Sequence, residues 1–275
     1  MGSLRCWGSV PNGTRPTTPT AVPGLSSTVK SVAAGTSHLC TVMVDGTMRC
    51  LGKNDQGQPG NDSTVNSNTP VTPIGVANVS HATAHSAGTC AISGLSGELR
   101  CWGYMPGNGT ARQPVPTVVP GFEEDTASVA QGGGNSHTCA ATTSGNVQCW
   151  GGNGKNGRFG TGVLEIGTQL SPVDVVSLTN SEQLEAGSGR TCAVTSDNSI
   201  SCWGYNGGFY TTSGDKAVPT PIDSLQAGAT AVTVSDSHAC VLMEDHSAKC
   251  WGGGIYGQLG NGSKVNSAEP VSVGQ

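Results

Sequence analysis

Apolar and polar residues alternate through five short segments of the chain, and each segment is bracketed by two cysteines. In the first segment Cys40 and Cys50 enclose nine residues, and folding it about Asp45 places Val42 opposite Met48. Residues two apart on a strand share a face, so this apolar pair lies on the same face as the cysteines. The other four segments repeat the arrangement with the apolar pairs Ile92 and Leu99, Ala141 and Val147, Val194 and Ile200, and Leu242 and Ala248. The alternation predicts five β-hairpins, each with one apolar face that carries two cysteines.

The centre of each segment carries residues that favour a tight turn. A three-residue hairpin loop needs one residue in the left-handed conformation, where Gly and Asn are favoured and His is enriched. The residues that follow the midpoints are Gly46, Gly145, Asn198 and His246, and the one longer segment has Gly94-Leu95-Ser96-Gly97 there. We therefore expect tight turns at these positions and, in every hairpin, a first cysteine directly opposite the second.

The hairpins belong to a repeat of nearly constant length, because their first cysteines lie 50, 49, 53 and 48 residues apart. Each hairpin is followed by Trp-Gly (Leu51-Gly52 in the first), a loop rich in Gly and Asn, a segment that begins with Pro, and a segment of small residues. Proline is found on edge strands, so the Pro-led segments are predicted outer strands and the small-residue segments inner strands. Four strands per repeat predict an all-β protein, a six-bladed β-propeller that forms a single domain over residues 1–275. Five of its repeats are complete and one is split or incomplete.

The incomplete repeat lies at the start of the chain. Residues 4–8 are identical to residues 99–103, so Cys6 stands on the outgoing arm of a hairpin that lacks its incoming arm. About 20–25 residues are missing against the period, and nothing in residues 1–3 resembles a signal peptide, which favours a processed chain or a fragment. An unpaired strand edge recruits other strands. Three outcomes are possible here: the ring stays gapped, residues 269–275 pair with residues 4–8, or a neighbouring chain donates strands. We favour pairing of the two ends, and we expect Cys6 to be unpaired or to form an intermolecular bond.

Composition excludes several classes of protein. The chain has 275 residues, 42 of them Gly, with 11% charged and 4% aromatic residues, which suits short strands and glycine-rich turns better than a helical core. The net charge of −5 and the lack of a basic stripe argue against nucleic acid or an anionic membrane surface as a partner. No apolar run approaches roughly 18 residues, so no membrane span is expected.

Paired cysteines at one register predict disulfides. Residues directly opposite each other on antiparallel strands can be bridged, and disulfides persist in oxidising compartments, so we expect an extracellular or periplasmic (secreted) protein. The predicted bridges are Cys40–Cys50, Cys90–Cys101, Cys139–Cys149, Cys192–Cys202 and Cys240–Cys250. Zinc is the rival, because His38, His137 and His238 each precede a cysteine by two positions. The four-ligand spacing of structural zinc is missing, so we expect no metal.

The repeat resembles a known family in its most characteristic phrase. The last repeat contains His238, Trp251-Gly252 and Gly257-Gln258-Leu259-Gly260-Asn261-Gly262, and the first contains Ala34-Gly35, His38, Gly46, Gly52 and Gly57-Gln58. This phrase is similar to that of the regulator of chromosome condensation (RCC1-like) repeat family, above all its cysteine-containing bacterial variety. The resemblance covers the whole chain and implies a β-propeller of four-stranded blades. It does not extend to that family's nuclear activities, because only scaffold residues match and a fold does not fix a function.

Motifs of catalysis are absent from the sequence. We find no nucleophile elbow, zinc-protease motif or phosphate-binding loop, so we expect neither an enzyme nor a cofactor. An enzyme at the mouth of the propeller channel is the alternative, and its polar groups are His85, Arg190, Glu185 and Asp236 at the ends of inner strands. The tryptophans occupy one register whatever the neighbouring loop, which is typical of packing between repeats; they are Trp7, Trp102, Trp150, Trp203 and Trp251.

The positions that break the repeat are the candidate binding residues. Aromatic residues on exposed loops are typical anchors of protein interfaces, and the candidates are Tyr104, Met105, Phe122, Phe159, Phe209, Tyr210 and Tyr256. Sequons for possible N-glycosylation occur at Asn12, Asn61, Asn78, Asn108 and Asn261. The sequence favours a non-enzymatic recognition scaffold that binds a protein or glycan ligand. The alternative is a structural subunit of an extracellular surface layer or filament, which self-associates by strand exchange at the incomplete blade.

Overall fold

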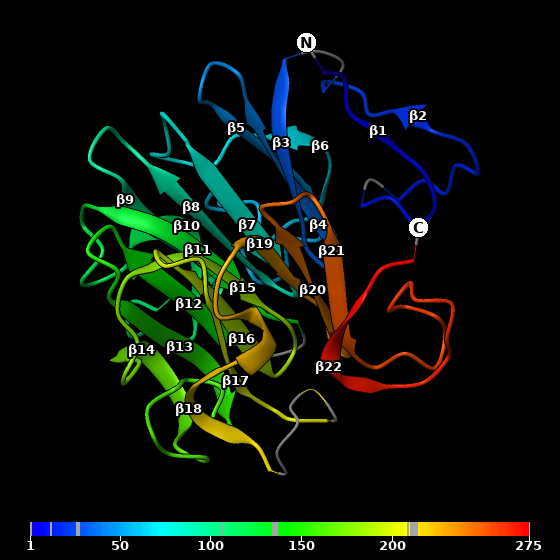
Figure 1. The fold of residues 1–275 in the computed structure, drawn as a ribbon. Helices are drawn as coiled ribbons and strands as arrows, with labels where there is room; N and C mark the ends of the chain where they lie inside the picture. Colours follow the sequence, from blue (N-terminus) through cyan, green and yellow to red (C-terminus); the bar gives the residue numbers. More distant parts are fainter. Residues whose placement is uncertain are drawn as a thin grey trace. The chain divides into compact units, whose positions relative to one another are not determined.

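The computed structural model describes residues 2–11, 13–25, 28–105, 107–133, 137–207, 209 and 214–274. Within these residues the chain forms five four-stranded antiparallel sheets, one two-stranded sheet and one 3-10 helix, η1 (Asp223–Leu225) (Figure 1). Each four-stranded sheet is called a blade below. The chain divides into two units, Met1–Thr126 and Ala127–Gln275. The expectation of a single domain over residues 1–275 therefore stays a prediction.

The first unit holds the two-stranded sheet and two blades. The two-stranded sheet, called the half-blade, pairs β1 (Arg5–Cys6) with β2 (Thr20–Ala21). Blade 1 has the strand order β3 (Val29–Ala34), β4 (His38–Met43), β5 (Met48–Gly52) and β6 (Ser67–Val71). Blade 2 has the order β7 (His81–His85), β8 (Gly88–Ser93), β9 (Glu98–Tyr104) and β10 (Arg112–Val118). The Pro-led segments form the strands at one edge, as predicted from the confinement of Pro to edge strands.

The second unit holds three blades of the same kind. Blade 3 runs from β11 (Thr126–Gln131) through β12 (His137–Thr142) and β13 (Val147–Gly154) to β14 (Gly167–Asp174). Blade 4 consists of β15 (Ser181–Ala186), β16 (Arg190–Thr195), β17 (Ile200–Gly204) and β18 (Lys216–Pro221). Blade 5 consists of β19 (Ala229–Val234), β20 (His238–Met243), β21 (Ala248–Gly252) and β22 (Ser267–Ser272). No helix in the described part of the chain is long and apolar enough to cross a membrane.

Every central hairpin has the register that the alternation predicts. Cys40 pairs with Cys50 and Val42 with Met48, and the other four hairpins repeat this register. The Cα atoms of the two cysteines are 4.1 Å apart in each hairpin, which is the close spacing of a non-hydrogen-bonded pair. All five pairs are disulfides, so the prediction of one bridge per blade is confirmed.

The hairpin turns also have the predicted conformation. Gly46, Gly145, Asn198 and His246 have φ angles of 78°, 84°, 60° and 63°, in the left-handed region. In blade 1 the carboxylate of Asp45 accepts hydrogen bonds from the hydroxyl and the main-chain N–H of Thr47, and these bonds lower its pKa. The turn therefore closes through an aspartate that is most stable in its ionised form.

Neighbouring blades pack through a joint that repeats along the chain. The face of a blade that carries the disulfide, called the disulfide face, packs against the tryptophan of the next blade. In the first unit the Cys40–Cys50 bridge clusters with Trp102. In the second unit Cys139 and Cys149 cluster with Trp203, and Cys192 and Cys202 cluster with Trp251. The disulfide thus closes its hairpin and also forms part of the wall that the next blade covers.

Two of the indole N–H groups donate hydrogen bonds within these joints. Trp102 Nε1 donates to the carbonyl of Gln58 at 2.7 Å, and Trp203 Nε1 donates to the carbonyl of Arg158 at 3.0 Å. Four tryptophans are fully buried, at positions 102, 150, 203 and 251, whereas Trp7 on the half-blade is 64% exposed. A fully buried indole is a packing residue, so the structure supports that interpretation for these four tryptophans.

Candidate functional site

Three of the aromatic residues proposed as exposed anchors are core residues instead. Phe122 and Phe209 are 0% exposed and Phe159 is 1% exposed, so the prediction that they lie on an interaction surface is wrong. Phe159 meets the ring of His137 edge-on, with ring centroids 6.4 Å apart. Phe209 packs on Trp251, with centroids 5.3 Å apart. The loops that carry these rings are rich in Gly, yet each ring packs inward against neighbouring residues. Burying an aromatic ring stabilises the fold more than leaving it exposed to water.

The remaining candidate residues differ in exposure. Tyr104 and Met105 are half-buried, and their main-chain N–H groups donate to the carbonyls of Ala87 and Ala111. Tyr256 is 82% exposed. Tyr210 lies outside the described residues. Of this set, Tyr256 is the described aromatic residue that a partner could cover most completely.

The sequon asparagines lie on turns. Asn78 is exposed with a φ of 51°, and Asn61, Asn108 and Asn261 are partly exposed. The side-chain carbonyl of Asn108 accepts a hydrogen bond from the N–H of Thr110 at 3.1 Å, a local bond that stabilises a turn. Asn12 lies outside the described residues. Glycosylation of these positions stays a prediction.

The polar groups assigned to an alternative enzyme are divided between the two units of the chain, His85 in the first and the other three in the second. His85 ends β7 in the first unit, where its Nδ1 accepts a hydrogen bond from the N–H of Ser86 at 2.8 Å. In the second unit Glu185 lies near the end of β15, and Arg190 begins β16. Asp236 lies in the turn before β20 and accepts a hydrogen bond from the N–H of Ser188 at 3.2 Å. Burial raises the pKa of Glu185.

Arg190 is the residue that shapes the loop of blade 4. It is 2% exposed, and its Nε and Nη2 donate to the carbonyls of Tyr205 and Asn206 at 3.2 and 3.4 Å. Its guanidinium lies 4.3 Å from the ring centroid of Phe209 and 5.6 Å from that of Tyr205. A planar cation between carbonyls and aromatic faces fixes the start of the loop in one conformation.

Asp215 fixes the other end of the same loop. Its Oδ1 accepts a hydrogen bond from the N–H of Asn206 at 2.8 Å, and its Oδ2 accepts one from Asn156 Nδ2 of blade 3 at 2.6 Å. The side chain of Asn206 in turn donates to the carbonyl of Gly214 at 3.1 Å and accepts the N–H of Phe209 at 3.1 Å. The described residues at the two ends of the loop, Asn206 and Asp215, are therefore bonded to each other and to the neighbouring blade.

Tyr205 is presented by this loop at the surface. It is 48% exposed, and its main-chain N–H donates to the carbonyl of Gly189 at 2.9 Å. Gly189 belongs to the turn that contains Ser188, whose hydroxyl bonds to the carboxylate of Asp236. We call Tyr205, Ser188 and Asp236 the blade-4 loop face. It combines an anchored aromatic ring with a polar rim.

A serine and a histidine beside this face form a turn and not a catalytic pair. Ser235 Oγ lies 2.7 Å from His238 Nδ1, but it also accepts the main-chain N–H groups of Ser237 and His238 at 3.3 and 3.1 Å. Burial, and then the charge of Arg190, lower the pKa of His238. These local bonds hold the hydroxyl oxygen in the turn, so the geometry favours a structural role.

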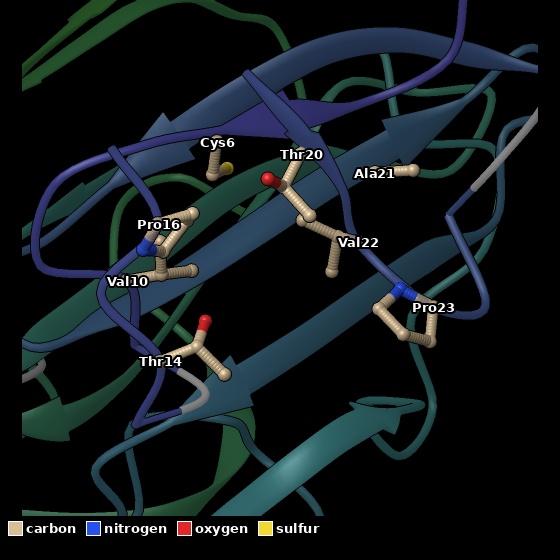
Figure 2. A pocket seen from close by; sticks show the side chains of 8 residues that line it. All are labelled: Cys6, Val10, Thr14, Pro16, Thr20, Ala21, Val22 and Pro23. Carbon is tan, nitrogen blue, oxygen red and sulfur yellow. The ribbon is translucent and has the colours of Figure 1, made fainter. Parts of the chain in front are cut away.

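A separate pocket lies in the first unit, on the half-blade. It has a volume of about 340 Å³, and Figure 2 shows the eight side chains that line it: Cys6, Val10, Thr14, Pro16, Thr20, Ala21, Val22 and Pro23. Among the described cysteines Cys6 alone lacks a disulfide, and burial raises the pKa of its thiol. The lining is mostly apolar, with two threonines and one thiol as its polar side chains. It offers no charged group that would orient a small polar ligand.

Comparison with known proteins identifies the repeat. The model of the regulator of chromosome condensation (RCC1) repeat matches residues 128–157, 182–208 and 229–258. The chain contains RCC1 repeats. Two curated relatives from Arabidopsis thaliana are the RCC1 domain-containing protein RUG3, mitochondrial, 30% identical over 69% of this chain, and the ultraviolet-B receptor UVR8, 29% identical over 89%. The matches cover 47% and 58% of those proteins, so this chain spans about half their length.

Solved structures show the same fold. Human WBSCR16 superimposes with a TM-score of 0.79 at 18% identity, over 94% of this chain and 72% of that chain. Yeast RCC1 (Prp20), in its complex with Kap60, superimposes with a TM-score of 0.54 at 15% identity, over 99% of this chain and 84% of that chain. The fold is therefore that of an RCC1-like propeller, a fold used for protein binding.

Within the RCC1 repeat, the loop organisers of blade 4 are the residues that sequence reasoning missed. Arg190 occupies the place of the repeated histidine, whose usual partner is a threonine of the next blade, as in His38 with Thr89 at 2.9 Å. Blade 5 has Ala239 at the threonine position, so this hydrogen bond is lost and the arginine turns toward its own loop. The joint loss of His and Thr in adjacent repeats was a readable signal of this change.

Proposed function

We propose that this chain is an extracellular or periplasmic recognition module that binds a protein partner through the blade-4 loop face. The observation that carries the proposal is the fixed, half-exposed ring of Tyr205, which stands on a loop held by Arg190 and Asp215. A residue whose main chain is held before binding loses little conformational entropy when a partner arrives. Tyrosine is also among the residues enriched at the energetic centres of interfaces.

Charge and chemistry favour a protein over other partners. The chain has a net charge of −5, which disfavours a polyanion. The five disulfides are consistent with an oxidising compartment, where a secreted recognition domain would work. Tyr205 contacts the turn whose Ser188 bonds to the carboxylate of Asp236, and this pair of groups suits a protein surface that offers an apolar contact and a donor. A glycan is the runner-up ligand, because aromatic faces also bind sugar rings.

The test compares wild-type protein with Tyr205→Ala and Asp236→Ala as immobilised baits for secreted proteins, and on a glycan array. Leu95→Ala is the matched control, because Leu95 is 97% exposed on a hairpin turn of blade 2 in the first unit, whereas the Tyr205 loop belongs to the second. We expect wild type and Leu95→Ala to retain the same secreted protein. Tyr205→Ala should bind that protein roughly 10- to 30-fold more weakly. Equal retention by wild type and Tyr205→Ala contradicts the proposed face, and selective binding to glycans alone contradicts the protein ligand.

A second candidate function is assembly with other copies. The exposure of Trp7, which contrasts with the fully buried tryptophans of the blades, is the observation that favours it. A large apolar ring at the surface is a candidate contact for a second copy, which sedimentation of wild type and Trp7→Ala over a range of concentrations would test.

A further inference from the structure

Three residues around one turn of the second unit depart from the repeat, and all three lie at the blade-4 loop face. Arg158 stands at the place of Gln58 in blade 1 and Gln258 in blade 5, and Arg190 stands at the place of the repeated histidine. Gly189 stands where the other four repeats have a serine or an alanine, at positions 37, 87, 136 and 237. Since the repeat folds with other residues at these positions, its scaffold does not require any of the three.

Arg158 puts a cation where other blades have a neutral amide. In blade 1 Gln58 Oε1 accepts the N–H of Gln56 at 2.9 Å, and Gln258 makes the same bond in blade 5. Arg158 closes its own loop too, because its Nε donates to the carbonyl of Lys155 at 3.0 Å. Closing the loop therefore needs a polar side chain at this position but no charge.

The rest of the Arg158 guanidinium reaches the next blade. Its Nη1 donates to the carbonyl of Ser188 at 3.3 Å, and the residue is 8% exposed. Within the described residues no carboxylate forms an ion pair with Arg158, and no group accepts a hydrogen bond from Nη2. Nη2 is not among the enclosed, unbonded polar atoms of this part of the chain, so it is open to solvent.

Burial lowers the pKa of Arg158, because loss of water disfavours the charged form. Arginine nevertheless stays protonated at physiological pH. A nearly buried cation of this kind is stabilised most by an anion that reaches its open edge.

Gly189 leaves space beside that open edge. A Cβ atom on Gly189 would lie 3.8 Å from Arg158 Nη2 and 3.1 Å from Tyr205 Cβ, so the residue lies between the cation and the aromatic side chain. Its φ angle is not in the left-handed region, so the backbone does not require glycine here. We call the space between Arg158 Nη2 and Tyr205, where the side chain is missing, the Gly189 notch.

The walls of the notch are held before anything binds. The main-chain N–H of Tyr205 donates to the carbonyl of Gly189 at 2.9 Å. Arg190, the next residue after Gly189, donates from Nε to the carbonyl of Tyr205 at 3.2 Å. The tyrosine is therefore tied to the turn that carries Gly189, while its ring stays 48% exposed. A site with fixed walls loses little entropy on binding.

The chemistry of the notch suits a carboxylate on a short apolar stem. A guanidinium donates strong, charge-assisted hydrogen bonds to a carboxylate, and the face of a tyrosine packs against methylene groups. The carboxylate of Asp236 bonds to Ser188 on the same turn, so a negative charge already lies nearby. A single open guanidinium edge beside that charge favours a singly charged ligand over a doubly charged phosphate.

We propose that the Gly189 notch binds the carboxylate of an aspartate or glutamate on the protein partner, with Arg158 Nη2 as the donor and the ring of Tyr205 against the stem. The inference rests on the proposed function and names the kind of residue that the partner presents there. The net charge of −5 opposes an extended acidic segment. Charges farther away than about 8 Å are screened at physiological salt, so one acidic side chain in an apolar setting is the matching ligand.

The experiment uses random linear peptides displayed on phage as the probe and the full-length, oxidised protein as the target. We expect wild type to select peptides that have Asp or Glu at a fixed place beside an apolar residue. One selected peptide is then synthesised in three forms, with its acidic residue, with the corresponding amide, and with phosphoserine at that place. Fluorescence anisotropy gives the affinity of each peptide.

The variants restore residues that the repeat uses elsewhere. Arg158→Gln removes the donor and Gly189→Ser fills the notch, and intact mass verifies that each keeps all five disulfides. Arg15→Gln is the control, because it removes the same charge from an exposed arginine of the first unit. We expect the acidic peptide to bind both notch variants roughly 10-fold more weakly than wild type, and Arg15→Gln as tightly as wild type.

A double-mutant cycle ties the donor to the carboxylate. The amide peptide should bind wild type as weakly as the acidic peptide binds Arg158→Gln, and combining both changes should cost little more than either one. Independent, additive losses would contradict a direct contact between the two groups.

The outcomes separate this inference from the proposed function. A selection on wild type that enriches no acidic peptide overturns the inference, and so does equal affinity of wild type and Arg158→Gln. If Tyr205→Ala still weakens binding in that case, the blade-4 loop face stands and only the carboxylate site is refuted. If neither variant changes the affinity, both are refuted. Tighter binding of the phosphoserine peptide than of the acidic peptide overturns the carboxylate as the ligand.

Discussion

The strength of the blade joint can be measured by substituting two tryptophans of the first unit, one buried in a joint and one exposed. Trp102 and Trp7 follow a cysteine in the same five-residue sequence, yet Trp102 is 0% exposed and Trp7 is 64% exposed. We predict that Trp102→Ala lowers the free energy of unfolding by about 3–5 kcal/mol, the cost of a large-to-small change in a core. Trp7→Ala, under conditions where the protein is monomeric, changes it by less than about 0.5 kcal/mol.

The structure also divides the effect between packing and the hydrogen bond. Trp102 Nε1 donates to the carbonyl of Gln58 at 2.7 Å, and the hydroxyl of Thr89 donates to the same carbonyl at 2.9 Å. Removing the indole N–H therefore leaves that carbonyl with a partner. Trp102→Phe is expected to cost about 1 kcal/mol for the lost hydrogen bond, in addition to the smaller ring. Most of the loss in Trp102→Ala then comes from the cavity beside Cys40–Cys50.

Urea unfolding followed by far-UV circular dichroism is the assay, because it does not depend on tryptophan fluorescence. The disulfides stay oxidised throughout. The free energies of unfolding of all variants are calculated with one common m-value, the slope of that free energy against urea concentration. The reasoning is refuted if Trp102→Ala unfolds within about 0.5 kcal/mol of wild type, because a buried ring with this packing cannot be removed so cheaply. It is also refuted if Trp7→Ala costs as much as Trp102→Ala.

Two further predictions concern titrating groups in the first unit. Burial, and then the charge of His85, lower the pKa of His38 from 6.5 to about 4. Between about pH 6.5 and pH 4, His38 is therefore protonated in the unfolded chain but not in the folded chain. The free energy of unfolding falls by about 3 kcal/mol because of His38 as the pH falls through this range toward 4. His38→Gln should flatten this part of the pH profile of urea unfolding, and parallel profiles for the two proteins would contradict it. Burial raises the pKa of Cys6, so iodoacetamide should modify it more slowly at pH 8 than a peptide thiol, with Cys6→Ser unlabelled. Labelling at the peptide rate would show that the thiol is exposed.

The hairpins could be predicted from sequence because their determinants are local. Alternation at a period of two fixes which residues face each other, and the cysteines then fall directly opposite each other. The turn at Asp45 and Gly46 needed only the residue types that tolerate a left-handed conformation. The five disulfides and the order of strands within each blade follow from these local rules, together with the length of the repeat.

The aromatic residues in loops could not be placed by the same rules. Phe159 stands between Gly157 and Gly160, and its burial depends on a neighbouring strand that is distant in sequence. The same position holds Pro59 in blade 1 and Leu259 in blade 5, and this apolar recurrence was a usable sign of a core position. Arg190 was assigned to a polar channel end, but its guanidinium lies against Phe209 beneath the loop. Contacts of this kind depend on tertiary structure, so a polar residue in a polar segment gives no warning of them.

The hairpins that the sequence predicts and the loop contacts that it does not predict have a common physical origin. A blade cannot bury both of its faces by itself, so its stability depends on the next blade, as in other repeat proteins. The disulfide at Cys40–Cys50 closes a hairpin that its register already holds, and its second role is to provide a rigid apolar wall for Trp102. The disulfide holds this apolar wall in shape from within its own hairpin. Blade 5 has the same hairpin register and the same disulfide as the other blades. A surface that is already ordered loses little further entropy when the next blade packs on it, so most of the burial of Trp102 on Cys40–Cys50 is available to stabilise the joint.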